Sequence, residues 1–122
     1  DWVLRDGLRQ LLRQSWADFF REFDVLLCPV APLPAIAHDQ QYLYDRRITV
    51  NGNQREYMDL MGWAGLAGVV YLPATVIPAG RTRQGLPVGI QIVGPYLEDS
   101  TPIRAAKLIS EVLGGFVPPD GY

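Results

Sequence analysis

Apolar residues recur at helical spacing over residues 3–22. Arginine, glutamine and aspartate occupy the opposite side of this segment. The resulting stripe is broad and partly aromatic, which predicts an amphipathic helix that packs on a substantial surface. The stripe follows Leu4, Leu8, Leu11, Leu12, Ser15, Phe19 and Phe23, with Trp16 and Phe20 widening it.

Three short apolar runs indicate strands. Residues 24–28 form a continuous apolar run, which is typical of a strand buried on both faces. The run stops at a proline-rich segment, residues 29–34, because proline removes backbone donors. Residues 74–79 and 88–93 also have strand character. Only a short polar turn joins these two, so we expect them to be antiparallel neighbours.

A polar excursion over residues 35–55 separates the first strand from a second helical segment. Within it, Asn51-Gly52 follows Ile48–Val50 and predicts a tight hairpin turn, since Asn and Gly tolerate positive φ. Residues 57–68 are apolar on nearly every side, which predicts a buried helix. Its glycines would let another backbone or a ligand approach closely, and they are Gly62, Gly65 and Gly68.

The last helix has clear end signals. Thr101 is expected as the N-cap, Pro102 as the first helical residue, and Gly114 as the stop. A pair of opposite charges at i, i+4 spacing is expected between Lys107 and Glu111. The expected apolar face consists of Ala105, Leu108, Ile109 and Val112.

The resulting order is helix, strand, excursion, helix, strand, strand, helix, an α/β pattern with few strands for its helices. This imbalance indicates that part of the sheet is missing.

The chain has 122 residues, 48% hydrophobic and 20% charged, which suits one soluble domain. Its net charge of −2 argues against a nucleic-acid partner. Neither a signal peptide nor an 18-residue apolar span is visible, so we expect no membrane partner and a cytoplasmic location.

Candidate reactive groups are few. The single Cys28 cannot form an intramolecular disulfide, and its apolar surroundings predict a small buried side chain. His38 is expected on a surface loop, and a cysteine hydrolase that uses Cys28 and His38 is a further alternative. The sequence has no HxxxH, CxxC, GxGxxG or Walker spacing, so neither a metal nor another cofactor is expected.

Three segments carry a resemblance to a known family. They are FDVLLCPVAP at residues 23–32, LPATVIPAG at residues 72–80 and GLPVGIQIVGP at residues 85–95. Together they resemble the C-terminal part of the amidase signature family, in its bacterial form. The resemblance implies an α/β fold, namely the C-terminal portion of a mixed-sheet α/β/α amidase-signature fold.

The resemblance also implies an activity. The family hydrolyses carboxamides to carboxylic acid and ammonia, or uses amides to deliver ammonia, through a Ser–cis-Ser–Lys triad and a Gly-rich oxyanion loop. Those parts lie upstream in the family. Here the only serines are Ser15, Ser100 and Ser110, without a serine pair, and the lone lysine is Lys107. We therefore expect residues 1–122 to be a C-terminal fragment of an amidase domain, without catalytic residues and inactive alone.

In the whole enzyme the second helix is expected to wall the substrate pocket, although plain core packing is the alternative. The expected substrate-facing residues are Met61, Trp63, Ala64, Leu66 and Ala67. Asp59 does not match the spacing of charged residues in ammonia-delivering relatives, which favours a simple amidase. Expected partners are a small amide and either a second copy or the missing N-terminal part. A stand-alone, non-catalytic binding or assembly module remains the alternative.

Overall fold

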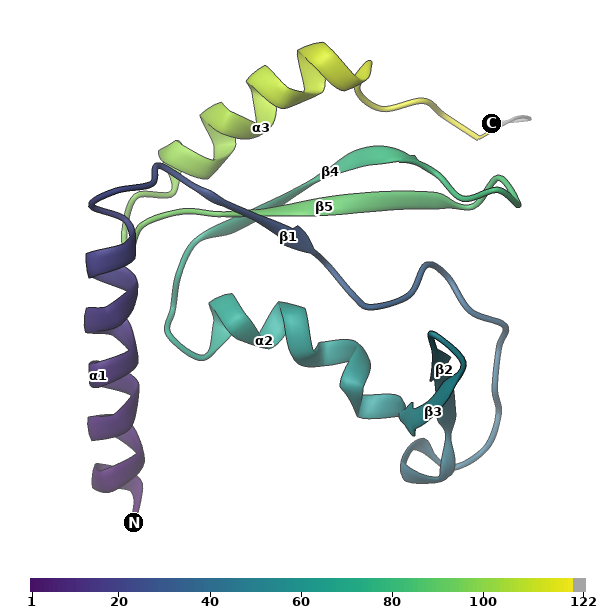
Figure 1. The fold of residues 1–122 in the computed structure, drawn as a ribbon, viewed down its shortest axis with the longest axis horizontal. Coiled ribbons are helices and arrows are strands. Elements are labelled where there is room, and N and C mark those ends of the chain that lie inside the picture. The colour runs from purple at the N-terminus through teal and green to yellow at the C-terminus, as the bar shows by residue number, and fades with distance from the viewer. Residues whose placement is uncertain (120–122) are drawn as a thin grey trace.

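The computed structural model of the chain describes residues 1–119. Figure 1 shows the path of the chain through these residues. The elements along it are α1 (Trp2–Phe19), β1 (Leu26–Pro29), the 3-10 helix η1 (Leu43–Asp45), β2 (Arg47–Val50), β3 (Asn53–Glu56), the 3-10 helix η2 (Tyr57–Met61), α2 (Gly62–Gly68), β4 (Ala74–Arg81), β5 (Pro87–Val93) and α3 (Ser100–Leu113).

The main sheet has three antiparallel strands in the order β1-β5-β4. The central strand β5 places Gln91 opposite Cys28 of β1 on one side and opposite Val76 of β4 on the other. The predicted antiparallel pairing of the two later strands is therefore confirmed. The predicted hairpin is confirmed too, because β2 and β3 pair around Asn51 and Gly52, whose φ angles are 51° and 80°.

Helices cover both faces of this sheet, with α3 on one face and α2 on the other (Figure 1). Side chains alternate along β5, so that Ile92 points to the α3 face and Val93 to the α2 face. The α3 face buries Ile77, Ile92 and Ala106. The α2 face buries Cys28, Ala67, Val70, Leu72 and Val93. This layering confirms the α/β fold class, and within residues 1–119 every paired strand is antiparallel.

The prediction that residues 24–28 form a strand buried on both faces is wrong. β1 begins at Leu26 and lies at the edge of the sheet. Cys28 faces the core at 4% exposure, whereas Leu27 on the opposite face is 47% exposed. β1 has a neighbouring strand on one side only. In addition, no described helix covers the face of β1 on which Leu27 lies.

The segment expected as one buried helix over residues 57–68 is instead two short helices. η2 has 3-10 geometry, and α2 takes over at Gly62. Only Ala67 of α2 is buried, because this helix touches the sheet along one side. Three glycines in seven residues lower the propensity for one long α-helix by roughly 1 kcal/mol each relative to alanine.

The C-terminal helix starts earlier than predicted. α3 begins at Ser100, and its N-cap residue is Asp99, so Thr101 and Pro102 lie inside the first turn. Thr101 still organises the entry, because its backbone N–H and its hydroxyl donate to Glu98 at 2.9 and 3.1 Å. Gly114 ends the helix as predicted, with φ of 90° and its N–H bound to the Ser110 carbonyl.

The face of α3 that meets the sheet also differs from the prediction. Ala106 is buried, and Ala105 and Ile109 pack beside it. Leu108 and Val112 are 64% and 84% exposed, so the expected apolar face is wrong for these two residues. Because α3 contacts the sheet along a narrow line, its wider apolar surface stays uncovered. Within residues 1–119, no ion pair joins Lys107 to Glu111.

The first helix projects from one end of the sheet (Figure 1). It ends at Phe19, three residues before the predicted end. Trp16 and Phe20, the latter just past the end of α1, pack against the α2-side core, yet no residue of α1 is buried. The leucines of the predicted stripe stay open to solvent, at 66% for Leu4 and 50% for Leu12. Residues 1–119 therefore do not provide the large packing surface that the sequence predicts for this stripe.

Candidate functional site: a hollow beside α2

A hollow of about 440 Å³ lies between α2 and the β2–β3 hairpin. Its wall combines residues from the proline-rich loop, the hairpin, η2 and α2. The lining side chains and backbone belong to Pro32, Val50, Arg55, Asp59, Gly62, Trp63 and Leu66. Apolar groups therefore form much of its surface, while two charged side chains contribute the polar part.

Arg55 and Asp59 form the polar part as an ion pair. The guanidinium Nη1 of Arg55 lies 3.6 Å from Oδ2 of Asp59, and both side chains are about half exposed. The two residues are four apart, across the junction from β3 to η2. Such a hollow suits a small molecule with an apolar body and a polar end, because a few placed polar groups orient a ligand on an apolar surface.

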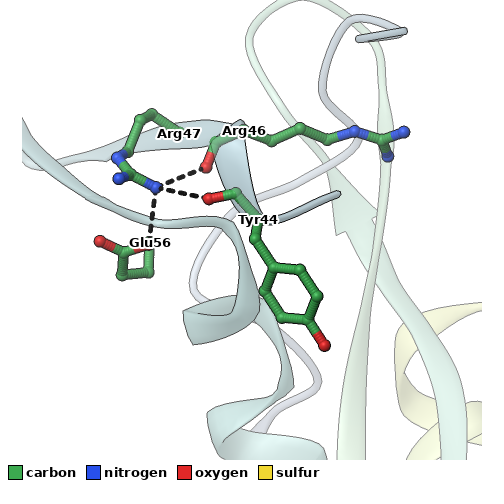
Figure 2. Close-up of polar contacts among 4 residues, drawn as sticks. All are labelled: Tyr44, Arg46, Arg47 and Glu56. Carbon is green, nitrogen blue, oxygen red and sulfur yellow. Dashed lines mark hydrogen bonds and ion pairs between the residues drawn. The ribbon is translucent and has the colours of Figure 1, made fainter. Parts of the chain in front are cut away.

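A network around Arg47 holds the hairpin that contributes Val50 and Arg55 to the hollow. Figure 2 shows the Arg47 guanidinium reaching three acceptors at once. Its Nη1 donates to Oε2 of Glu56 at 2.6 Å and to the carbonyls of Arg46 and Tyr44 at 3.1 and 3.2 Å. Arg47 and Glu56 are also paired in the strand register. This network therefore joins the base of the hairpin to η1.

The neighbouring arginine connects the hairpin to η2. Nε of Arg46 donates to the Gln41 carbonyl at 2.9 Å. The Arg46 guanidinium also lies 5.3 Å from the ring centre of Tyr57, the first residue of η2. A cation over an aromatic face is attracted by the ring quadrupole. Arg46 and Arg47 thus fix the hairpin relative to the segment that leads into α2.

A buried amide connects α2 to the sheet. The Gln91 side chain is 5% exposed, and its Nε2 donates to the backbone carbonyl of Trp63 at 3.3 Å. The same nitrogen lies 3.3 Å from Sγ of Cys28, directly across the β1–β5 pairing. The first turn of α2 is therefore hydrogen-bonded to the central strand.

The structure distributes the predicted substrate-facing residues over three environments. Trp63 and Leu66 line the hollow. Met61 ends η2 and is 57% exposed, and Ala64 is half-buried. Ala67 packs in the core beside Cys28 and Val93.

Five residues that line the hollow are not in the predicted substrate-facing set, although the sequence marked Gly62 as a place where a ligand could approach. They are Pro32, Val50, Arg55, Asp59 and Gly62. Two of them could have been found from local signals. They are Val50 and Arg55, because the Asn51-Gly52 turn pairs the strands that carry them as a hairpin. Pro32 lies in the proline-rich loop just after β1, and no local pattern predicts the course of that loop.

Other reactive groups lie apart from a catalytic arrangement. Cys28 is buried as predicted, with its sulfur facing the Gln91 amide, whereas His38 is exposed on the loop before η1. Ser15 returns its hydroxyl to the Leu11 carbonyl at 3.3 Å, and Lys107 is exposed on α3. Among residues 1–119, no group of three or more His, Cys, Asp and Glu side chains is placed to hold a metal ion. In the same residues, no helix combines the length and apolar character that a bilayer crossing needs.

Comparison with known proteins assigns the family. The family model described as Amidase matches residues 4–102, which is most of the chain. The three segments that carry the resemblance lie within this range. The chain belongs to the amidase signature family.

Curated relatives and solved structures agree with this assignment. The glutamyl-tRNA(Gln) amidotransferase A subunit of an Exiguobacterium strain is 36% identical over 112 residues, covering 92% of this chain. The protein of the same description from Parvibaculum lavamentivorans is 30% identical, covering 94%. A crystal structure of an amidase superposes with a TM-score of 0.74 and 26% identity, covering 90% of this chain and 25% of that one. The chain spans about a fifth of the length of these curated relatives, 21% and 22%.

Proposed function

We propose that this chain is the C-terminal portion of an amidase that hydrolyses small carboxamides. The observation that carries the proposal is the family match across residues 4–102. The α/β/α layering and the similarity to a solved amidase support the same conclusion. The overall reaction converts an amide and water into a carboxylic acid and ammonia.

The chemical step belongs to the upstream part of such an enzyme. In the family's mechanism a serine hydroxyl attacks the amide carbon, and the C–N bond then breaks to release ammonia. Water afterwards hydrolyses the acyl-enzyme and frees the serine. None of the serines at positions 15, 100 and 110 has a neighbouring serine in sequence, and Lys107 is exposed. We therefore propose that this portion is inactive alone.

Its proposed contribution is to the sheet and to the pocket wall. β1, β5 and β4 would continue the sheet of the whole enzyme. The hollow beside α2 would receive the non-reacting part of the amide, with Trp63 and Leu66 in contact with an apolar group. Met61, Ala64 and Ala67 would support this wall from the flanks. Such contacts would bind the non-reacting part of the amide equally in the ground state and in the transition state, so they would lower KM and leave kcat unchanged.

The uncovered leucines of α1 support a partner that lies in the same polypeptide. Leu4, Leu8, Leu11 and Leu12 are between 50% and 67% exposed along one side of the helix. A contiguous apolar surface of this kind marks an interaction site. We propose that the upstream part of the enzyme covers it, in a cytoplasmic protein, and that isolated copies associate through the same face.

Sequencing of the coding region upstream of Asp1 tests the proposal directly. A Gly-Ser-Ser-Gly motif and an earlier lysine in the same reading frame are the expected result. A stop codon close upstream, with a start codon for this chain alone, would contradict the proposal. It would favour the stand-alone binding or assembly module instead.

A further inference from the structure

One polar side chain occupies a core position between the sheet and α2. Gln91 lies on the central strand, and Val93, two residues on, packs in the α2-side core. Among residues 1–119 Gln91 is the one buried polar side chain, at 5% exposure. A buried amide costs free energy unless its groups are hydrogen-bonded. An apolar residue would not carry this cost at the same position. The amide of Gln91 therefore needs hydrogen-bond partners inside the core.

The partners of Gln91 supply that explanation. Its Nε2 has two hydrogens, and it lies 3.3 Å from both Sγ of Cys28 and the carbonyl oxygen of Trp63. The sulfur is a weak acceptor that the strand register brings close. The carbonyl oxygen of Trp63 is the stronger acceptor. It has two lone pairs, so it can accept from Gln91 in addition to a bond within the helix. The bond to Trp63 is thus the one that links sheet to helix.

The helix that receives this bond is weak by itself. α2 has seven residues, and Gly62 and Gly65 flank the Trp63 turn. A Cβ added at either glycine would meet no atom within 4 Å, so side-chain packing there does not fix the turn. Short isolated helices are marginal in water. Ala67 packs the second half of α2 in the core, and the hydrogen bond from Gln91 joins the first turn, with Trp63, to the central strand.

From this geometry we infer that Gln91 is a positioning residue. It fixes the first turn of α2 on the sheet, and thereby holds the Trp63 indole in the wall of the hollow. Gln91 itself does not line the hollow. The role of Trp63 toward an amide rests on the proposed function, whereas the tether from Gln91 to α2 does not.

Fluorine NMR of the 122-residue chain labelled with 5-fluorotryptophan tests the tether. The three tryptophans are Trp2, Trp16 and Trp63. In Gln91→Met, which keeps the length of the side chain, the Trp63 signal should shift and broaden. The Trp16 signal, from the same core face, should stay. The matched control Gln84→Met removes an exposed amide on the β4–β5 turn and should leave all three signals unchanged.

An unchanged Trp63 signal in Gln91→Met would overturn the inference. An equal shift of Trp16 would also overturn it, since that result means general loosening of the core. If Gln91→Met fails to fold, Gln91→Asn provides the answer, because it keeps the amide but cannot reach the carbonyl. A Trp63 signal in Gln91→Asn that is the same as in the unmodified chain would contradict the tether.

The whole enzyme separates this inference from the proposed function. There Gln91→Met should raise KM for an amide about fivefold, the effect of one net hydrogen bond, with kcat unchanged. If Trp63 is displaced but KM is unchanged, the inference that Gln91 positions α2 still stands. That result would contradict only the assignment of the hollow to the substrate.

Discussion

The guanidinium carbon of Arg13 lies 3.7 Å from the centre of the Tyr96 ring. Four residues earlier on the same helix, Arg9 lies 5.0 Å from the ring centre of Tyr71. α1 therefore docks on the rest of the chain through arginines stacked on tyrosines, together with Trp16. Its leucine stripe is left for another surface. This division of faces supports the proposal that the chain is one part of a larger protein.

Replacement of Arg13 by alanine should loosen the docking of α1. A cation over an aromatic ring contributes roughly 0.5–1 kcal/mol at a partly exposed site. Amide hydrogen exchange in α1 should accordingly become about two- to fivefold faster, measured by mass spectrometry. Arg5→Ala is the control, because Arg5 makes only a solvent-exposed ion pair with Asp1 at 3.7 Å. Equal effects from both variants would count against this docking mode.

The leucine stripe should drive association of the isolated chain. Sedimentation velocity should find oligomers for the 122-residue chain, since exposed apolar patches favour self-association. Leu8→Gln combined with Leu11→Gln should shift the distribution toward monomer. Val3→Gln is a matched control on the same helix, 77% exposed but outside the stripe. A monodisperse, stable monomer of the unmodified chain would refute the role given to the stripe.

Gly94 should tolerate no side chain. A Cβ at Gly94 would lie 2.5 Å from Cδ and 2.9 Å from Cγ of Pro102, at the point where α3 meets the end of β5. Overpacking of this kind typically costs about 1–3 kcal/mol. Gly94→Ala should lower the unfolding midpoint in urea, followed by circular dichroism.

The control for this glycine lies in α1. A Cβ added at Gly7 would meet open space, and Gly7 sits within a helix. Gly7→Ala should therefore stabilise the helix by up to about 1 kcal/mol. Destabilisation by both alanines, or by neither, would show that the contact with Pro102 does not limit position 94.

Arg47→Ala should loosen the β2–β3 hairpin selectively. The change removes one guanidinium from three acceptors, Glu56 and two backbone carbonyls. The loss should stay within about 1 kcal/mol, because exposed ion pairs contribute little. Hydrogen exchange by NMR should accelerate in β2 and β3 but not in β5. Arg83→Ala, at the exposed β4–β5 turn, should leave the hairpin unchanged.

Local signals predicted the elements of the fold well. The Asn51-Gly52 turn and the Gly114 stop follow from the backbone preferences of single residues, and the two later strands follow from their apolar pattern. The errors were of two kinds. The break at Gly62 and the early start of α3 are local, whereas the others came from packing. Leu27 and Leu108 are apolar, and composition alone places them inside, yet both face a side of the chain that residues 1–119 do not cover.

The candidate site was only partly predictable for a related reason. Of the five predicted substrate-facing residues, Trp63 and Leu66 line the hollow, whereas Ala67 packs in the core, the alternative that the sequence left open. Gln91 escaped notice, because its role depends on a contact with Trp63, 28 residues away in sequence. Long-range pairing of this kind is set by the sheet, and the apolar pattern of β5 gives no hint of it.

Release of ammonia from a simple carboxamide tests the central claim most directly. It should be measured on the purified 122-residue chain and on the same chain joined to its upstream polypeptide. The joined protein should hydrolyse the amide, and the chain alone should show no turnover. Turnover by the isolated chain that survives repurification would contradict the account.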